Sequence, residues 1–492
     1  MNKDENIRKI ITGSLIVILG LIVTKLLGYI FRLIIARFGP EQYGLFSLGL
    51  SIVTIGSLIA LMGLDRGILR YVSYYIGSKD NTKIRGTIIF AFKATIISGL
   101  LLAIIIFFLA PIISTKIYHN NGLISIIKIL AFSIPAYVLS EVCLSIIKAY
   151  REVKYMVYSK NMLEGIIKII LSLIAIYLGY SIFGVSIAYT LSLFFTFIIS
   201  LYFIEKKIFP FLKDNVKAQY NNKQLLVFSL PLLLNNIMEL TLISTDTLLI
   251  GYFLSSNYVG IYNAAFPTAA LVMSIPVSIL TIFTPTIGKL AGEGNIEEQK
   301  KIFRISSKWI FFVSLPISLI FIFFSKDILM LLFGSDYVIG YVVMSILSIG
   351  FLINTISFTA RKILEVNKKS NLILFNSIIA AALNIVLNLV LIPKYGLVGA
   401  ALSSVASFIV YSLLFVVQSS LIAKFNPPLM QYLKTILAGI LAIIWVLLIR
   451  NYITSNIFFI VITFGIIYFL LALLFRVIKK EEFMLLKSIR KS

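Results

Sequence analysis

Cysteine and histidine are almost absent from this chain of 492 residues. Cys143 is its single cysteine and His119 its single histidine. A lone cysteine excludes an intrachain disulfide and a cysteine metal cluster, because each needs more than one thiol. A lone histidine argues against histidine-rich zinc sites and against a Ser-His-Asp triad. The chemistry of the chain therefore depends on other side chains.

Acidic residues and nucleotide-binding motifs are scarce as well. The chain has 20 Asp and Glu against 44 Lys and Arg, and it has no sequence of the type G-x-x-x-x-G-K-[ST]. No segment between apolar runs is longer than about twenty residues, which is too short for a separate catalytic domain. We therefore expect neither an enzyme nor a transporter that hydrolyses ATP itself.

Apolar residues dominate the rest of the chain. They make up 60% of it, only 13% of the residues are charged, and the mean hydropathy is +1.02. Such a composition indicates a protein that crosses the membrane many times. Apolar runs of roughly 20 residues predict an all-α integral membrane protein with about fourteen spans. These predicted spans lie near residues 10–36, 43–64, 86–112, 123–147, 155–178, 183–204, 224–251, 259–286, 305–325, 338–360, 370–392, 396–418, 431–449 and 456–475.

The positions of the basic residues test this map, because Lys and Arg collect in cytoplasmic loops. With both termini placed in the cytoplasm, most basic residues lie in inner segments. The outer segments hold only Arg37, Lys116, Lys326, Lys394 and Arg450. We expect a multi-pass protein of the cell (plasma) membrane whose inner loops bind anionic lipid headgroups. This topology explains the net charge of +24, so we expect no nucleic-acid partner.

The first predicted span contains two full charges, Lys25 and Arg32. They stand two helical turns apart, so they share one helix face with Ser14 and Gly28. Charged side chains inside a membrane face an aqueous or anionic interior, or they snorkel or pair with acids to hold helices together. Because intramembrane charge is functional by default, we predict a binding site on this face.

Two stretches of the chain recur at nearly constant spacing. Arg32–Phe46 resembles Thr247–Tyr262 at an offset of 215 to 216, and Phe183–Ala188 resembles Tyr395–Ala400 at an offset of 212. Similar offsets at both ends of a six-span block predict two related halves with the same membrane orientation.

The repeat predicts the domain organisation. We expect two pseudo-symmetric six-helix lobes around a central cavity, an N-lobe of residues 1–223 and a C-lobe of residues 224–418. Residues 419–492 then form two extra C-terminal helices and a basic cytoplasmic tail. The Lys-rich segment Glu205–Lys223 is the predicted linker between the lobes, although a simple cytoplasmic loop would look the same.

The fifth predicted span carries Lys160, Glu164 and Lys168 at intervals of four residues, so one helical face can neutralise its own charge. We predict an ion ladder there, with Lys168 as a secondary candidate for the cavity. Glu141 has no such neighbour in its own helix. We expect it to pair across the lobe with Lys25 or Lys168.

Three short motifs carry a resemblance to a known family. They are the run Ala36–Phe46, the segment Gly63–Gly67 with Arg70–Tyr71 after it, and the run Tyr395–Ala401. Together they resemble the polysaccharide biosynthesis and export proteins. These are the lipid-linked oligosaccharide flippases of the multidrug/oligosaccharidyl-lipid/polysaccharide exporter superfamily, and the resemblance covers essentially the whole chain.

The resemblance implies alternating access by two six-helix lobes, with a polyprenyl-diphosphate-linked oligosaccharide carried from the cytoplasmic to the outer leaflet. The doubly anionic headgroup has to cross about 30 Å of hydrocarbon, so a cavity with fixed cations would lower its barrier. Lys25, Arg32 and Lys168 are the predicted substrate-binding residues. The expected partners are the lipid-linked oligosaccharide, membrane lipids and enzymes of glycan assembly.

Acids and amides gather in the second half of the chain. The seventh predicted span puts Glu239 and Asp246 on one stripe with Asn235, and the eleventh has Asn384 and Asn388 four residues apart. Oxygen ligands suit Na⁺, and buried acids can take up protons. Because some members of the superfamily are cation-coupled, we predict a site for Na⁺ or H⁺ and no other cofactor. The alternative is that the amides only join helices by hydrogen bonds.

Asp65, Arg66 and Arg70 form a charged cluster at the inner end of the second predicted span. An ion pair among them could order the cytoplasmic mouth of the cavity as a gate. The alternative is a cluster that only sets the topology.

Two other functions stay open at this point. A cation-coupled multidrug exporter of the same superfamily would share the lobes and the repeat, but acids would have to dominate its cavity. A membrane scaffold or a membrane-embedded enzyme of glycan assembly is the other alternative. Such enzymes commonly need a sizeable outer loop with acid-base residues, and the outer loops here are short.

Overall fold

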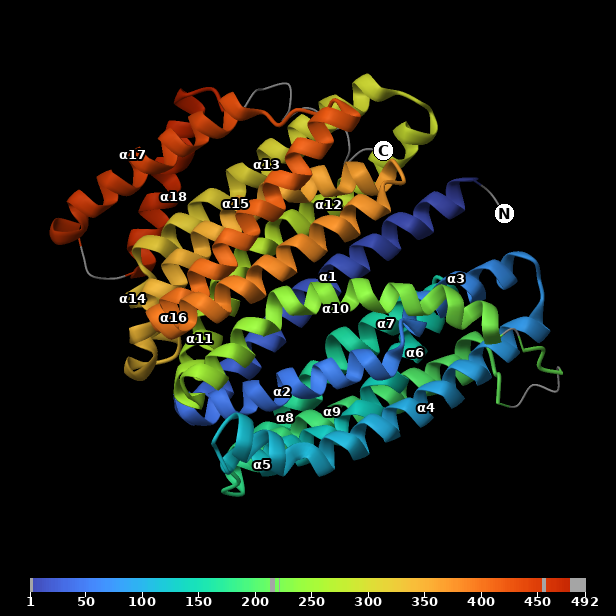
Figure 1. Ribbon diagram of the computed structural model, residues 1–492. Coiled ribbons are helices and arrows are strands. Elements are labelled where there is room, and N and C mark those ends of the chain that lie inside the picture. Colours follow the sequence, from blue (N-terminus) through green and yellow to red (C-terminus); the bar gives the residue numbers. More distant parts are fainter. Residues whose placement is uncertain (1–2, 213–216, 221, 454–456, 478–492) are drawn as a thin grey trace. The chain divides into compact units, whose positions relative to one another are not determined.

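The structure describes residues 3–212, 217–220, 222–453 and 457–477, and its only regular secondary structure in these ranges is helical, with no strand. The structure is a computed structural model (Figure 1). Ten of its helices are long and apolar enough to cross a membrane. The chain is therefore a multi-span, all-α membrane protein, as the composition predicted.

The helices are connected by short turns. In chain order they are α1 (Lys3–Ala36), α2 (Pro40–Leu61), α3 (Leu64–Gly77), α4 (Asn81–Ile112), α5 (Gly122–Ala131), α6 (Ser133–Ala149), α7 (Val153–Met156), α8 (Glu164–Tyr177), α9 (Ile182–Phe203), α10 (Asn222–Phe253), α11 (Ser256–Ala269), α12 (Ser274–Gly292), α13 (Ile296–Phe323), α14 (Ser325–Leu332), α15 (Tyr341–Val366), α16 (Ser370–Ala423), α17 (Leu429–Ile453) and α18 (Ile457–Leu474).

Irregular turns interrupt or extend several of these helices. The segments Ile113–Ile117, Val157–Leu163 and Ile204–Ile208 are π-helical, with one wider turn each. Helix α16 covers two predicted spans and breaks its helical dihedral angles at Gly396, where φ is 57° and ψ is −134°. A helix such as α16 can be counted as one span or as two. The predicted count of fourteen spans therefore stays a prediction.

Two compact units divide the chain, Met1–Asn263 and Ala264–Ser492. The first unit takes in α10 and the start of α11. Helix α10 packs on α2 and α3. Gly63, between α2 and α3, lies so close to α10 that a Cβ added there would be 2.3 Å from the carbonyl oxygen of Ser229. The lobe boundaries that the repeat predicts, at 223 and 418, stay predictions.

Helices α3, α4 and α6 form the apolar core at one end of the first unit. Ile68, Ile88 and Ile147 are fully buried in it. Helix α4 begins next to this core at an acidic cap: the Asp80 carboxylate accepts hydrogen bonds from the Thr82 hydroxyl (2.6 Å) and the Lys83 amide (3.1 Å). These bonds, the hydroxyl's first, lower the pKa of Asp80 to about 2.

The predicted linker Glu205–Lys223 is packed against the first unit along the stretch around Phe209 and Phe211. Both rings are buried, and the Phe211 ring stacks on Phe92 with the ring centroids 5.2 Å apart. Nε of Arg85 donates a hydrogen bond to the Phe211 carbonyl oxygen at 2.9 Å. This stretch is therefore part of the core of its unit, a role that its Lys-rich composition did not indicate.

In the second unit, α15 packs against both α13 and α16. The hydroxyls of Ser307 (α13) and Thr359 (α15) share a hydrogen bond of 2.6 Å. Hydrogen bonds link α13 to both α18 and the residues just after it. The Tyr468 hydroxyl donates to the Phe312 carbonyl oxygen at 2.8 Å, and Nζ of the buried Lys308 donates to the carbonyl oxygen of Val477 at 3.0 Å.

Candidate functional site

The cationic stripe on α1 is open at its middle. Lys25 is exposed and Arg32 is half-buried. A Cβ added at Gly28, between them on the same face, would meet no atom within 4 Å. The side chain of Ser14 lies outside the described residues. The predicted stripe thus presents one exposed and one half-buried cation, with open space at Gly28 between them.

Arg32 is positioned by a tyrosine on the next helix. Nη1 of Arg32 donates a hydrogen bond to the Tyr43 hydroxyl at 3.1 Å, and that hydroxyl donates to the carbonyl oxygen of Asn263 at 2.9 Å. Tyr43 is 1% exposed, so its ring fixes the direction of the hydroxyl. Our sequence interpretation did not single out Tyr43, although it lies within the Ala36–Phe46 motif.

We expect Tyr43→Phe to leave the fold nearly intact and to slow transport. The phenylalanine keeps the buried ring, so the loss of one hydroxyl should cost about 1 kcal/mol of stability. The Arg32 guanidinium then loses an acceptor that holds it at the helix surface. Thermal unfolding in detergent and a transport assay on the same preparation measure the two effects. Equal transport rates for the variant and the wild type would contradict a positioning role.

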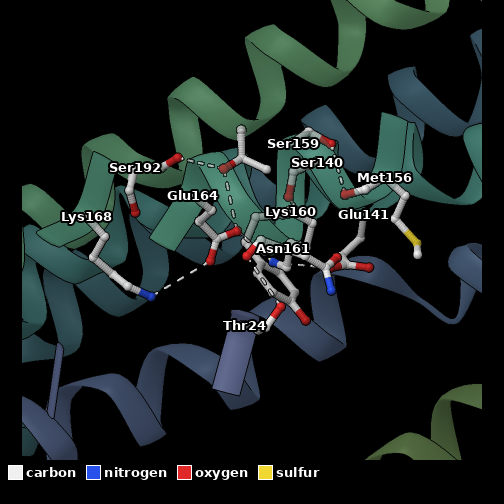
Figure 2. A network of polar contacts seen from close by, with 12 residues as sticks. Thr24, Ser140, Glu141, Met156, Ser159, Lys160, Asn161, Glu164, Lys168 and Ser192 are labelled. Atoms are coloured by element: carbon white, nitrogen blue, oxygen red, sulfur yellow. Dashed lines mark hydrogen bonds and ion pairs between the residues drawn. The ribbon is translucent and has the colours of Figure 1, made fainter. Parts of the chain in front are cut away.

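Four charged side chains form a network inside the first unit (Figure 2). Nζ of Lys160 lies 3.0 Å from Glu164 and 3.5 Å from Glu141, and Nζ of Lys168 lies 4.0 Å from Glu164. Glu164 is 9% exposed and also accepts a hydrogen bond of 3.5 Å from the Thr196 hydroxyl. The ion ladder that the four-residue spacing predicted is therefore present.

The predicted partner of Glu141 was wrong. Glu141 pairs with Lys160 and not with Lys25 or Lys168. Lys160 lies in the π-helical segment Val157–Leu163, whose wide turn the spacing of an ordinary α-helix does not anticipate.

Lys168 is held less tightly than Lys160. Its ammonium lies 4.8 Å from the ring centre of Phe31 on α1 and 5.6 Å from that of Tyr189 on α9. Cation–π contacts of this kind add to the long ion pair with Glu164. Because Phe31 directly precedes Arg32, the Lys168 ammonium comes close to the cationic helix α1.

Tyr189 also lines a small internal cavity. The cavity has a volume of about 20 Å³, which is enough for one water molecule. Residues of both polar and apolar character line it: Leu50, Val53, Thr54, Ser57, Ser133, Tyr137 and Leu193. Tyr137 faces Lys160 on its other side, with the ammonium 5.4 Å from the ring centre. Tyr137 thus contacts the charge network and also lines the cavity.

No ion pair joins Asp65 to Arg66 or Arg70 in the part of the chain that the structure describes. The Asp65 Oδ1 atom is buried there without a hydrogen-bond partner, and both arginines are exposed. The Arg70 guanidinium lies 4.2 Å from the ring centre of Phe228 on α10. Arg70 therefore contacts α10 through an aromatic ring, and the ion-paired form of the cytoplasmic gate is not what the structure shows.

Asp246 on α10 is 1% exposed and accepts a short hydrogen bond from the Tyr262 hydroxyl. In the repeat, Tyr262 aligns with Phe46, whose ring contacts Phe31 edge-on at 5.9 Å. The second copy of the repeat thus has an acid and a phenol where the first has two rings. The side chains of Asn235 and Glu239, which share the predicted stripe, lie outside the described residues.

Asn384 and Asn388 are fully buried in the second unit. Nδ2 of Asn388 donates to Oδ1 of Asn384 at 3.1 Å, and Nδ2 of Asn384 lies 3.4 Å from the Ser404 hydroxyl. Asn376 and Gln418 exchange two amide hydrogen bonds, of 2.8 and 2.9 Å. These amides join the two halves of α16 across its break at Gly396, and their oxygens are of the type that binds Na⁺. The described residues contain no group of three or more His, Cys, Asp or Glu arranged to hold a metal.

The fold is that of an all-α, multi-span membrane protein. Two solved structures share the fold. The lipid II flippase MurJ in its inward closed conformation has a TM-score of 0.73 at 16% identity over 93% of this chain and 97% of that one. A multidrug resistance MATE family transporter in its inward-facing conformation has a TM-score of 0.69 at 17% identity over 82% and 94%.

Residues 34–340 match the model of the polysaccharide biosynthesis protein family, and the chain belongs to this family. Three curated relatives illustrate its range. Membrane protein MJ1068 of Methanocaldococcus jannaschii is 24% identical over 90% of each chain. Stage V sporulation protein B of Bacillus subtilis is 23% identical over 96% of each. A protein of Haloferax volcanii named "Probable low-salt glycan biosynthesis flippase Agl15" is 25% identical over 34% of this chain and 36% of its own.

Proposed function

We propose that this protein is an alternating-access flippase that moves a polyprenyl-diphosphate-linked oligosaccharide from the cytoplasmic to the outer leaflet. The observation that carries the proposal is the pair of cations on an open face of α1, Lys25 and Arg32. Membership of the polysaccharide biosynthesis family supports it, as does the similarity to two proteins named as flippases, Agl15 and MurJ. The protein would act in surface polysaccharide or glycan assembly, alongside the enzymes that build and use the lipid-linked glycan.

The proposed architecture has fourteen spans and both termini in the cytoplasm of a plasma membrane. Two six-helix lobes of residues 1–223 and 224–418 would enclose the cavity, and residues 419–492 would add two helices and a tail. The concentration of Lys and Arg in alternate loops supports the topology. The internal repeat supports the lobes, since parallel repeats form two halves about an axis along the membrane normal.

The cations would act on the diphosphate, which carries the charge that hydrocarbon excludes. A cation in contact with a phosphate oxygen contributes on the order of 4 kcal/mol at an effective dielectric near 20, before desolvation is subtracted. Arg32 can grip phosphate oxygens with paired donors, whereas Lys25 acts as a point charge. Lys168, loosely held between two rings, would move from Glu164 to the headgroup.

A coupling cation, Na⁺ or H⁺, would bind at Glu239, Asp246, Asn384 and Asn388. Asp246 is a buried acid that accepts a hydrogen bond from the Tyr262 hydroxyl, which supports its role as a binding group for H⁺. The amide oxygens of Asn384 and Asn388 on α16 support a role as ligands for Na⁺. Asp65, Arg66 and Arg70 would act at the cytoplasmic mouth through the contact between Arg70 and Phe228.

A cation-coupled multidrug exporter is the second candidate function, and the likeness to a MATE transporter favours it. A cavity for cationic, aromatic drugs needs acids on its surface. The open face of α1 carries Lys25 and Arg32 instead, so it favours an anionic substrate.

Liposomes that contain a fluorescent polyprenyl-diphosphate oligosaccharide test the proposal. We expect the wild type to move the lipid between leaflets, and Lys25→Gln and Arg32→Gln to slow this movement at least tenfold. Lys128→Gln is the matched control, because Lys128 lies on α5 with its ammonium 5.0 Å from the centre of the Phe107 ring on α4. Imposed Na⁺ and pH gradients test the coupling cation.

Two outcomes decide between the candidates. Movement that persists unchanged in both α1 variants would contradict the cationic site. No movement of several lipid-linked glycans by the wild type, together with export of small organic cations, would establish the multidrug exporter instead.

A further inference from the structure

The first turns of α2 and α11 touch through their backbones. A Cβ added at Gly44 would lie 1.7 Å from the carbonyl oxygen of Ser256, and one added at Gly260 would lie 1.8 Å from the carbonyl oxygen of Pro40. Real Cβ atoms do not approach other atoms so closely, and the atoms met are backbone, which cannot turn aside. Only glycine at both positions permits this approach.

The two contacts are reciprocal in the repeat. Pro40 and Ser256 are 216 residues apart, and so are Gly44 and Gly260. This is the offset of the repeated sequence, so each residue of one contact has its counterpart in the other. Gly44 contacts Ser256, and its counterpart Gly260 contacts Pro40, the counterpart of Ser256. Such an exchange of partners is expected at a two-fold axis. The crossing of α2 and α11 is therefore a point where the two repeats meet on their own pseudo-symmetry axis.

Breaking the two glycine contacts would leave neither facing carbonyl without a partner. Pro40 and Ser256 are the first residues of α2 and α11. In an α-helix the carbonyl of the first residue accepts a hydrogen bond from the amide four positions further along. The contact between the glycines is thus one of van der Waals packing. It is tight when closed, and breaking it leaves the Pro40 and Ser256 carbonyls hydrogen-bonded within their own helices.

Two hydrogen bonds flank the crossing. The Tyr43 hydroxyl donates to the Asn263 carbonyl oxygen at 2.9 Å, and Nδ2 of Asn120 donates to the Ser256 hydroxyl at 3.2 Å. Both link an element of the first repeat to an element of the second, and water can replace either bond. One of them also holds the hydroxyl that accepts from Arg32.

We propose that the crossing of Gly44 and Gly260 is the reversible closure at the predicted outer end of the transport pathway. Helices α2 and α11 part there when the cavity opens outward and meet again when it opens inward. The Arg32–Tyr43–Asn263 chain of hydrogen bonds connects this closure to the cation on α1, so a headgroup that engages Arg32 weakens one of its two flanking bonds. This inference rests on the proposed transport function.

A reversible disulfide tests the closure in the full-length protein. In a Cys143→Ser background, Asn120→Cys with Ser256→Cys places two thiols where side-chain atoms lie 3.2 Å apart. We expect oxidation to slow flipping of the fluorescent lipid at least tenfold and a reductant to restore it. The control pair is Ser325→Cys with Ser345→Cys, whose hydroxyls are 2.9 Å apart within the second unit, and its oxidation should leave the rate unchanged.

A second measurement does not depend on transport. Gly44→Ala or Gly260→Ala, added to the Asn120/Ser256 cysteine pair, should slow disulfide formation at least tenfold because the closed contact no longer fits. Gly288→Ala is the control, since a Cβ there meets nothing within 4 Å. Gel shifts after maleimide labelling report the fraction that is cross-linked.

The outcomes separate this inference from the proposed function. If the fully oxidised protein transports as fast as the protein treated with reductant, the proposed closure is wrong. It is also wrong if the disulfide forms at an unchanged rate in both glycine variants. If the reduced protein moves no lipid-linked glycan, the proposed substrate is wrong. The rate of disulfide formation then still decides whether the glycine crossing opens and closes.

Discussion

Replacing Glu164 by glutamine should lower the stability of the protein by about 3 kcal/mol. The glutamine keeps the size of the side chain and removes its charge. Glu164 is 9% exposed and is the acid nearest to both Lys160 and Lys168, so its neutralisation leaves a net positive charge inside the first unit. A buried charge without its counter-charge is far more costly than the intact pair is favourable. Thermal unfolding in detergent measures the loss.

A control and a rescue make this prediction specific. Glu152→Gln breaks the pair with Lys154, whose side chains are 42% and 46% exposed, and should cost less than about 1 kcal/mol. Adding Lys168→Met to Glu164→Gln restores neutrality and should recover most of the stability. If the double variant is as unstable as the single one, the charge balance is not the cause.

Replacing Gly63 by alanine should be at least as damaging to the first unit. Gly63 lies between α2 and α3 with φ at 69°, a conformation that costs a residue with a Cβ about 1–2 kcal/mol. The added methyl group would also lie 2.3 Å from the Ser229 carbonyl oxygen and 3.1 Å from the Leu233 amide nitrogen on α10. Because these atoms are backbone, α10 as a whole would have to move away from the junction. We expect a loss of folded protein in fluorescence-detected size-exclusion chromatography.

Gly179→Ala separates the two causes. Gly179 has φ at 80°, and a Cβ there would meet nothing within 4 Å, so this variant carries the backbone strain without the clash. It should fold with a modest loss of stability. Similar behaviour of the two variants would show that strain alone matters at Gly63 and that α10 is not packed tightly there.

The ion ladder shows how far local spacing reaches. Four-residue intervals predicted the contacts of Lys160, Glu164 and Lys168, since residues so spaced are neighbours on any helix. Glu141 has no charged neighbour at that spacing, and its predicted partners, Lys25 or Lys168, were wrong. Its actual partner, Lys160, depends on how α6 packs on its neighbours. Contacts within one helix were predictable, and contacts between helices were not.

Tyr43 and Phe211 illustrate the second kind of contact. Nothing in the periodicity of the chain indicates that the Tyr43 hydroxyl joins Arg32 to Asn263, because that carbonyl lies 220 residues away. Phe211 stands in a Lys-rich stretch that reads as a loop, yet its ring is buried against Phe92. Both depend on which helices the fold brings together.

Composition and pattern were enough to establish a helical protein of many membrane spans and the cations of the first span, and the motifs carried the family. These properties follow from short stretches of chain, since a bilayer selects long apolar helices and makes any charge within them conspicuous. The buried partners of those charges, the break at Gly396 and the meeting of Gly44 with Ser256 came from packing. Such contacts join residues far apart in the chain, so they exist only once the helices have assembled.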